Sequence, residues 1–202
     1  MRYLIISCCF LIVSCGSYSK KNQLTEHEIK NQFITNPYFS DTKQDYVYKA
    51  SIQVYDNNFG GLLIIKKIED GYHRVVFTTE MGAKLFDFSI TETDFKVNYI
   101  LDELNKKLLI NLLKTDFKAL VQEQNFVSKS FTKDTIQIYQ TAILGKKHFY
   151  YVSEHLDQII RAGYRKEKVH FLFSDISNNI ANQITIKHHN IKLEINLKSI
   201  SK

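Results

Sequence analysis

The sequence predicts an α+β fold in which a strongly curved antiparallel sheet of about eleven strands, an incomplete half-open β-barrel, is covered by helices. Three observations support this fold class. Eleven runs rich in β-branched and aromatic residues are separated by turn residues, and one run of about twenty residues changes to helical spacing. The chain also has only 7 Gly and 1 Pro, which leaves no flexible linker between domains. Because about eleven strands cannot form one flat layer, we expect the sheet to curl.

The N-terminus has the pattern of a lipoprotein signal peptide. After Arg2, residues 3–13 are almost entirely apolar, a run too short to span a bilayer but typical of a signal-peptide core. The run ends in Ile12-Val13-Ser14-Cys15, which resembles the bacterial lipobox. Such signals are cleaved before the cysteine, which then carries acyl chains. We therefore expect residues 1–14 to be the signal peptide and Cys15 to be lipidated; an ordinary signal peptide with incidental cysteines is the alternative.

Cysteine usage agrees with lipidation. The three cysteines lie at positions 8, 9 and 15, so cleavage before residue 15 leaves a single thiol. Neither an intrachain disulfide nor a CxxC metal or redox site can then form. The acyl chains on Cys15 are the only bound group that we expect, with no other cofactor and no metal. Two or more acyl chains anchor a protein stably, whereas one chain is marginal.

The residues after Cys15 indicate which membrane holds the protein. In bacteria with two membranes, an Asp straight after the lipidated cysteine retains a lipoprotein at the inner membrane, but here Gly16 follows. Some bacterial groups use an acidic run for surface export, and residues 17–21 contain no acid. The pattern thus resembles that of a protein anchored in the outer membrane and facing the periplasm.

The elements follow in order along the chain. Residues 15–45 are polar and should form a tether after the lipidated cysteine, with a short helix over Leu24–Ile34 that begins at Thr25 and is closed by Pro37. Residues 46–202 should form the half-barrel domain, which starts with a meander of five strands and ends with six more. These strands are predicted over Tyr46–Tyr55, Gly61–Ile68, Tyr72–Thr79, Lys84–Thr91, Phe95–Leu101, Ile136–Leu144, His148–Glu154, Gln158–Tyr164, Val169–Phe173, Gln183–His188 and Ile191–Leu197.

One amphipathic helix is predicted between the two groups of strands. Over residues 102–121 the apolar residues recur at helical spacings, with acidic residues at the start and lysines toward the end. The sequence does not decide whether this helix is broken near Thr115-Asp116. A curved sheet with one apolar face needs a cover, and this helix is the expected lid.

Alternation along the strands indicates the side chains that face the interior. The predicted inward set includes Phe77, Phe86, Phe88, Phe95, Val97 and Tyr99. Because one helix covers little of the sheet, we expect these residues to line an apolar cavity of lipid size. A solid core made of the same side chains is the alternative.

A further pattern lies between Ser51 and Phe88. It consists of Gly60-Gly61 in the second strand, the segment Gly71-Tyr72-His73-Arg74-Val75-Val76-Phe77 and the loop Thr79-Glu80-Met81-Gly82. These features resemble the LolA/LolB-like lipoprotein localisation family, whose fold is a half-barrel covered by helices. The lipobox matches the outer-membrane lipoprotein receptors of LolB type rather than the soluble carriers of LolA type.

The resemblance implies a role for the loop that contains Met81 and Gly82. In the receptors, an apolar residue, typically Leu, precedes Gly in this loop, protrudes into solvent and is needed to receive and insert acyl chains. Met81 stands at that place, with Glu80 where Pro is common, and the family's interior Trp residues are absent. A Met at a turn tip also has no strand face to pack on, and its thioether is adaptable. In the alternative, Met81 folds back over the barrel mouth as a plug.

The sequence carries no catalytic constellation, and we expect no enzyme. The GxSxG, HExxH, GxGxxG and P-loop patterns are all missing. His188 and His189 are adjacent on a predicted strand, so they should point to opposite faces and cannot bind one ion together. The net charge of +6 is spread along the chain, which argues against nucleic acid as a partner.

The resemblance therefore implies a lipid-anchored outer-membrane lipoprotein that accepts acylated lipoproteins from a soluble periplasmic carrier of LolA type and inserts them in the outer membrane. Its expected partners are these lipoproteins, the carrier and outer-membrane lipid, and it should act as a monomer. The alternative is an accessory envelope lipoprotein that uses the same fold to bind lipid or another envelope protein.

Overall fold

The computed structural model describes residues 17–200, so the lipobox and Cys15 lie outside the described residues. Within residues 17–200 the chain forms two helices and fifteen strands. They are α2 (Tyr18–Lys21), β1 (Thr25–His27), β2 (Phe33–Thr35), β3 (Asp45–Val54), β4 (Asn57–Glu69), β5 (Tyr72–Thr78), β6 (Lys84–Ile90), β7 (Phe95–Ile100), α3 (Lys107–Val121), β8 (Gln124–Phe126), β9 (Lys129–Lys133), β10 (Ile136–Ile143), β11 (Lys146–Val152), β12 (Leu156–Ala162), β13 (Glu167–Ser177), β14 (Ile180–His188) and β15 (Leu193–Ser199).

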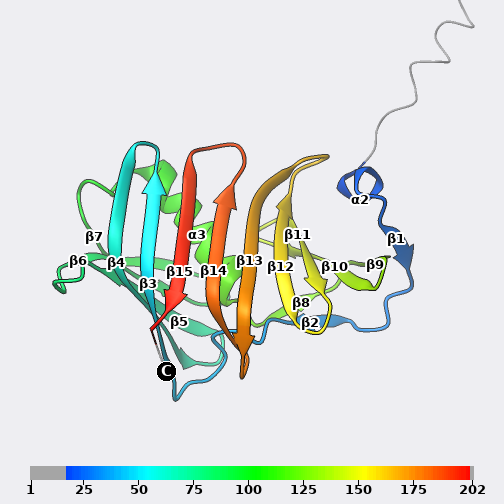
Figure 1. Cartoon of the computed structure of the whole chain (residues 1–202), viewed down its shortest axis with the longest axis horizontal. Coiled ribbons are helices and arrows are strands. Elements are labelled where there is room, and N and C mark those ends of the chain that lie inside the picture. The colour runs from blue at the N-terminus through cyan, green and yellow to red at the C-terminus, as the bar shows by residue number, and fades with distance from the viewer. Residues whose placement is uncertain (1–16, 201–202) are drawn as a thin grey trace, which may run out of the picture.

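Thirteen of these strands form one curved antiparallel sheet, seen in Figure 1, in the order β1-β9-β10-β11-β12-β13-β14-β15-β3-β4-β5-β6-β7. β2 and β8 form a separate two-stranded sheet. The last strand, β15, pairs with β3, so that Leu197 lies opposite Ala50 and Ile195 opposite Ile52. This pairing joins the meander β3–β7 to the second group of strands and makes one continuous surface.

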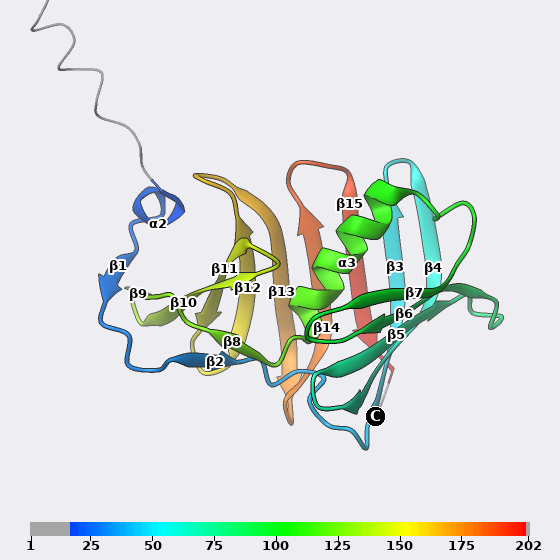
Figure 2. The same cartoon turned by 180° about the vertical axis from the view of Figure 1, so that it is seen from behind.

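The helix α3 lies across the concave side of the sheet (Figure 2). Its buried apolar side chains recur every three or four residues, which places them on one stripe facing the strands. Leu109, Leu113, Phe117 and Leu120 form this stripe, and Ala119 and Val121 are also buried near the C-terminal end. The helix is continuous through Thr115, whose hydroxyl donates to the carbonyl of Asn111 at 2.7 Å.

The predicted α+β class, with about eleven strands covered by helices, is wrong. Each of the eleven predicted runs corresponds to a strand to within a few residues at its ends, but four more strands are present (β1, β2, β8 and β9), each of three to five residues. Runs this short carry no readable alternation. Among the described residues, helix is confined to α3 and the four-residue α2, so the protein is mainly a single large open sheet with little helical cover.

The predicted helix over Leu24–Ile34 is also wrong, since this segment forms β1 and β2. Glu26 of β1 lies opposite Phe131 of β9, so the backbone of this segment extends the edge of the large sheet. Lys129 reinforces the pairing with a hydrogen bond to Glu26 of 2.6 Å. Sheet extension satisfies the backbone groups that a helix would have satisfied internally.

Aromatic side chains from a non-helical segment cover part of the concave face. The Tyr38 ring lies 4.7 Å from the Phe173 ring, and the Phe39 ring lies 5.2 Å from the Tyr46 ring. Tyr38 also donates its hydroxyl to the carbonyl of Leu156 at 2.6 Å. The part of residues 15–45 that the structure describes, expected to be a tether, therefore packs onto the domain.

A second, smaller core lies on the outer face of the sheet. There α2 packs against β11 through Tyr18, whose ring lies 4.5 Å from the Phe149 ring. Across residues 17–200, neither helix has the length and apolar character needed to cross a membrane. The main core lies between the sheet and α3 and positions the site described next.

Candidate functional site

Three of the aromatic residues predicted to line a cavity instead lie in the filled core between the sheet and α3. Phe77, Phe86 and Phe88 are fully buried on β5 and β6. The rings of Phe86 and Phe88 stack at 4.5 Å, and Phe117 of α3 lies 5.7 Å from Phe86. The space left beside Phe77 and Phe86 is about 10 Å³, which is about one water molecule. This part of the interior is a solid core.

The other three predicted residues lie on the edge strand β7 and divide between its two faces. Phe95 packs 5.0 Å from Phe88, and Val97 lies opposite Phe88. A register shift between Asp87 and Phe88 then places Tyr99 opposite Asp87, on the outer face, with 42% of its surface exposed. Tyr99 is therefore not part of the concave face, because a β-bulge reverses the alternation that the sequence predicts.

Met81 and Gly82 form the tip of the β5–β6 turn, which projects beyond the edge of the sheet in Figure 1. Met81 is 95% exposed. Gly82 has a φ of +84°, and its N–H donates to the carbonyl of Thr79 at 3.0 Å, so the turn is tight and Gly82 is conformationally required. Met81 does not cover the barrel mouth.

An apolar groove opens at the N-terminal end of α3. It has a volume of about 130 Å³ and lies between α3 and the turns after β3 and β14. Most lining side chains are apolar, and Leu108 at its lip is 58% exposed. Four of its residues, Val54, Phe59, Leu104 and Leu109, also line the small inner space beside Phe77, so the groove leads toward the core.

The C-terminal half of α3 is held by a buried polar cluster. Asp116 accepts a hydrogen bond from Arg161 of β12 at 3.0 Å and lies 2.7 Å from Nε2 of His188 on β14. Burial lowers the pKa of Arg161, while Asp116 opposes this effect. Near the same end, Lys118 donates to the carbonyls of Thr91 and Glu92. The C-terminal half of α3 is thus attached to the rest of the fold by hydrogen bonds and an ion pair as well as by apolar contacts, whereas the N-terminal half lies against apolar side chains.

Arg161 belongs to a polar row that crosses neighbouring strands on the concave face. Thr141 lies opposite His148, and His148 lies opposite Arg161. All three are buried, and the Thr141 hydroxyl and His148 Nε2 make no hydrogen bond within the described residues. Burial lowers the pKa of His148 to about 4, so its imidazole is neutral at pH 7.

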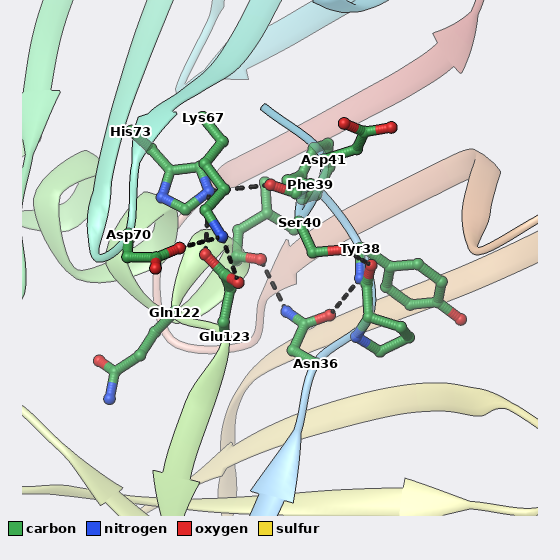
Figure 3. A network of polar contacts seen from close by, with 12 residues as sticks. Asn36, Tyr38, Phe39, Ser40, Asp41, Lys67, Asp70, His73, Gln122 and Glu123 are labelled. Carbon is green, nitrogen blue, oxygen red and sulfur yellow. Dashed lines mark hydrogen bonds and ion pairs between the residues drawn. The ribbon is translucent and has the colours of Figure 1, made fainter. Parts of the chain in front are cut away.

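A larger cleft of about 690 Å³, lined by charged, polar and apolar residues, lies at the C-terminal end of α3. Figure 3 shows the charged network beside it, where Lys67 contacts Glu123 at 2.8 Å and Asp70 at 2.9 Å. His73 bonds to the carbonyl of Phe39 at 2.9 Å, and burial lowers the pKa of its imidazole. Lys67, Asp70 and Glu123 are thus paired with one another, and an apolar chain in this cleft would lie against charged groups.

The two ends of α3 therefore differ in what they can accept. They lie about 20 Å apart, given 15 residues at about 1.5 Å each. The N-terminal end offers an apolar groove with an exposed lip, whereas the C-terminal end offers paired charges. The N-terminal end is the better chemical match for a hydrocarbon chain, because burying charged groups against hydrocarbon is costly.

Sequence reasoning missed Asp116, Arg161 and His188 as a unit. One signal was available, since Asp116 stands seven residues after Leu109 and three after Leu113, on the apolar stripe of the helix. A charge at such a position needs a buried partner. The partners themselves lie 45 and 72 residues farther along the chain, beyond the reach of any local pattern. As predicted, His188 and His189 point to opposite faces: His188 contacts Asp116, and His189 lies 3.7 Å from Glu167.

Comparison with known proteins identifies the fold but not a family. No protein-family model matches this chain, and no curated protein sequence matches it. Among solved structures, it is similar to a LolA superfamily protein from Nitrosomonas europaea, with a TM-score of 0.52 and 7% sequence identity over 82% of this chain and 88% of the other. At this identity the likeness concerns the fold alone and does not single out the receptor branch.

Proposed function

We propose that this protein is a lipid-anchored outer-membrane lipoprotein, facing the periplasm, that accepts acylated lipoproteins from a soluble LolA-type carrier and inserts them in the outer membrane. The observation that carries the proposal is the apolar groove at the N-terminal end of α3, on an open curved sheet whose fold is similar to that of a LolA superfamily protein. Transfer of this kind needs no catalytic group, in keeping with the expectation that the protein is not an enzyme.

The groove has the right chemistry for an acyl chain. Each CH₂ moved from water into such a groove contributes roughly 0.8 kcal/mol, so small differences in fit between carrier, receptor and bilayer set the direction of transfer. At about 130 Å³ the groove is smaller than ligand pockets, which span about 300–1,000 Å³. Complete acyl chains therefore require the N-terminal half of α3 to move outward.

The attachments of α3 favour such a movement. Its N-terminal half is held mainly by apolar side chains, which acyl chains can replace, and Leu108 there already faces solvent. Its C-terminal half is held by Asp116 and Lys118, which bond to strands and turns on both sides. We infer that this polar end acts as a pivot while the apolar end opens.

Met81 supports the insertion step. It is an isolated, fully projecting apolar side chain on a tight turn whose backbone is fixed by hydrogen bonds. A flexible thioether in this position can enter a membrane surface or a carrier's groove without changing the fold. Its place matches that of the protruding residue in the receptors that the sequence resembles.

The proposed anchor would hold the domain close to the membrane. Tyr18 is packed on β11, three residues after Cys15. Three extended residues span about 10 Å, so acyl chains on Cys15 would keep the α2 corner of the domain within about that distance of the lipid surface.

One observation favours an accessory envelope lipoprotein instead. Phe77, Phe86 and Phe88 fill the interior beneath α3 and leave only about 10 Å³ there. A protein that binds another envelope protein on its surface needs no larger cavity.

A transfer assay decides between these functions. A soluble carrier loaded with a radiolabelled lipoprotein is mixed with vesicles that contain the acylated full chain, and the label in the vesicles is measured. We expect transfer by the native protein and a strong loss with Met81→Glu. The matched control is Leu144→Glu, which also changes an exposed apolar residue at a hairpin turn and should transfer normally. No transfer by the folded native protein would leave the accessory function.

A further inference from the structure

Two histidines and one glutamate come together on the outer face of the sheet, opposite α3. One ring nitrogen of His170, one of His189 and a carboxylate oxygen of Glu167 lie within 4.8 Å of one another. We propose that these three side chains bind a divalent transition-metal ion, with Zn²⁺ as the first candidate. This site goes beyond the acyl-chain function proposed above and does not depend on it.

The ligand set has the chemistry of known metal sites. Two imidazoles and one carboxylate bind Zn²⁺ in sites that keep a fourth position for water, and the same set binds non-haem Fe²⁺. Zn²⁺ bonds are about 2.0–2.2 Å long, so the ligand atoms must approach one another slightly. His189 and Glu167 are both partly exposed and can rotate to do so.

The backbone of the three ligands is fixed by the sheet. Glu167 begins β13, His170 follows three residues later, and His189 comes directly after β14. β13 and β14 are paired through Val169 and His188, and the His189 N–H donates to the carbonyl of Lys168 at 3.0 Å. A bound ion would therefore meet a largely preformed site, which lowers the entropic cost of binding.

Neighbouring side chains orient two of the ligands. Tyr18 donates its hydroxyl to one oxygen of Glu167 at 3.3 Å, and the other oxygen lies 3.7 Å from Nε2 of His189. His170 Nε2 lies 2.7 Å from the amide oxygen of Gln158, which is an acceptor and keeps the proton on that nitrogen. The second nitrogen of His170 then carries a free lone pair, an arrangement common behind metal-bound histidines.

The charge around the site is compatible with a cation. Burial lowers the pKa of His170, which favours the neutral imidazole that a metal ion requires. Lys187 lies opposite His170 on β14, but its ammonium group is directed to Glu194 at 3.3 Å. Glu167 supplies the negative charge that partly balances the ion.

The ion would also fasten the N-terminal segment. Glu167 already bonds to Tyr18 of α2, close to the proposed lipid anchor at Cys15. Metal binding orders Glu167, so we expect it to strengthen the attachment of α2 to β13 as well as the pairing of β13 with β14.

The test is calorimetric titration of ZnCl₂ into the full, untagged chain in detergent, with the cysteines at 8, 9 and 15 replaced by serine so that no thiol competes. We expect one saturable site and a higher Tm with Zn²⁺ that EDTA reverses. His189→Ala and Glu167→Gln should each weaken binding by at least about tenfold. Glu167→Gln keeps the shape of the side chain, so it controls for misfolding. The matched control is His155→Ala, an exposed histidine in the β11–β12 turn, which should bind as the parent does.

Three results would overturn the proposal. The first is no saturable binding to the folded parent. The second is a loss of Zn²⁺ affinity in His155→Ala as large as that in His189→Ala, which would indicate that the ion binds at dispersed surface sites. The third is undiminished affinity in both His189→Ala and Glu167→Gln, which places the ion elsewhere.

Discussion

Asp116 of α3 and Arg161 of β12 form a buried ion pair in which Nη1 donates to Oδ1 at 3.0 Å. His188 contacts the other carboxylate oxygen, so Asp116 has a partner on each side. Burying such charges costs desolvation energy that the attraction only partly offsets. We infer that the pair mainly sets the position of α3 along the sheet, because apolar contacts alone would allow the helix to slide.

The first prediction follows from this pair. Asp116→Ala should lower the free energy of unfolding by about 3–5 kcal/mol, because it leaves the Arg161 charge buried without a partner. The double variant Asp116→Leu with Arg161→Met should be much less destabilised, since it removes both charges of the pair and leaves neither buried alone. Urea unfolding of the two variants and the native chain measures both values. A double variant as unstable as the single one would contradict this view of the pair.

The second prediction concerns two adjacent glycines of β4. A Cβ on Gly61 would lie 1.8 Å from the carbonyl oxygen of Thr78, whereas one on Gly60 would meet nothing within 4 Å. Gly61→Ala should therefore destabilise the protein by about 3 kcal/mol, because β5 must move away. Gly60→Ala should stabilise it by about 0.5 kcal/mol through lower chain entropy in the unfolded state. Equal thermal midpoints for the two variants would refute the close approach of β5.

The third prediction is a pH dependence at Asp87. This buried carboxylate accepts hydrogen bonds from Arg74 at 2.7 and 3.0 Å and from Lys84 at 3.0 Å, and the Arg74 guanidinium holds its pKa well below the usual range. The folded pKa lies below the unfolded value of about 3.9, so the stabilisation is present above that value and is lost as pH falls toward the folded pKa.

Asp87→Asn should accordingly cost about 2 kcal/mol at pH 7 and progressively less below about pH 5. Denaturant unfolding across that pH range checks the trend. The control is Asp56→Asn, whose side chain is 94% exposed and should change stability little at any pH. A constant cost for Asp87→Asn from pH 7 to pH 3 would disprove the assigned pairing.

The fourth prediction separates function from stability in the β5–β6 turn. Met81→Glu should change the free energy of unfolding by less than about 0.5 kcal/mol, because the side chain packs against nothing. Gly82→Val should cost about 1–2 kcal/mol, because a β-branched residue resists the φ of +84°. Thermal unfolding of both variants measures this, and a large loss in Met81→Glu would mean that the transfer assay reports on folding.

The long strands were predictable where apolar and polar side chains alternate along the sequence. Phe86 and Phe88 alternate with polar neighbours, and each of the eleven long runs corresponds to a strand to within a few residues at its ends. The short strands β1, β2, β8 and β9 were not predictable, since three to five residues hold too little periodicity and form only because a partner edge is present. Tyr99 shows the same limit, because the bulge that moves it to the outer face depends on the pairing with β6.

The candidate site was predictable in part. The exposed Met81 turn follows from local sequence, because a short turn with Gly82 leaves its tip without a neighbour. The filled interior did not follow, since whether Phe77 and Phe86 line a cavity or a core depends on how closely α3 approaches the sheet.

The amino-acid pattern by itself determined the long strands, the one long helix, the lipobox and the exposed turn, because each depends on residues close together in the chain. Only the tertiary structure decided how the two halves of the sheet join, through β15 and β3, and which distant side chains meet. The Asp116–Arg161–His188 cluster and the Glu167–His170–His189 cluster both depend on pairings between separate strands. Such pairings are set by packing and backbone hydrogen bonding across the whole sheet, which no local pattern specifies.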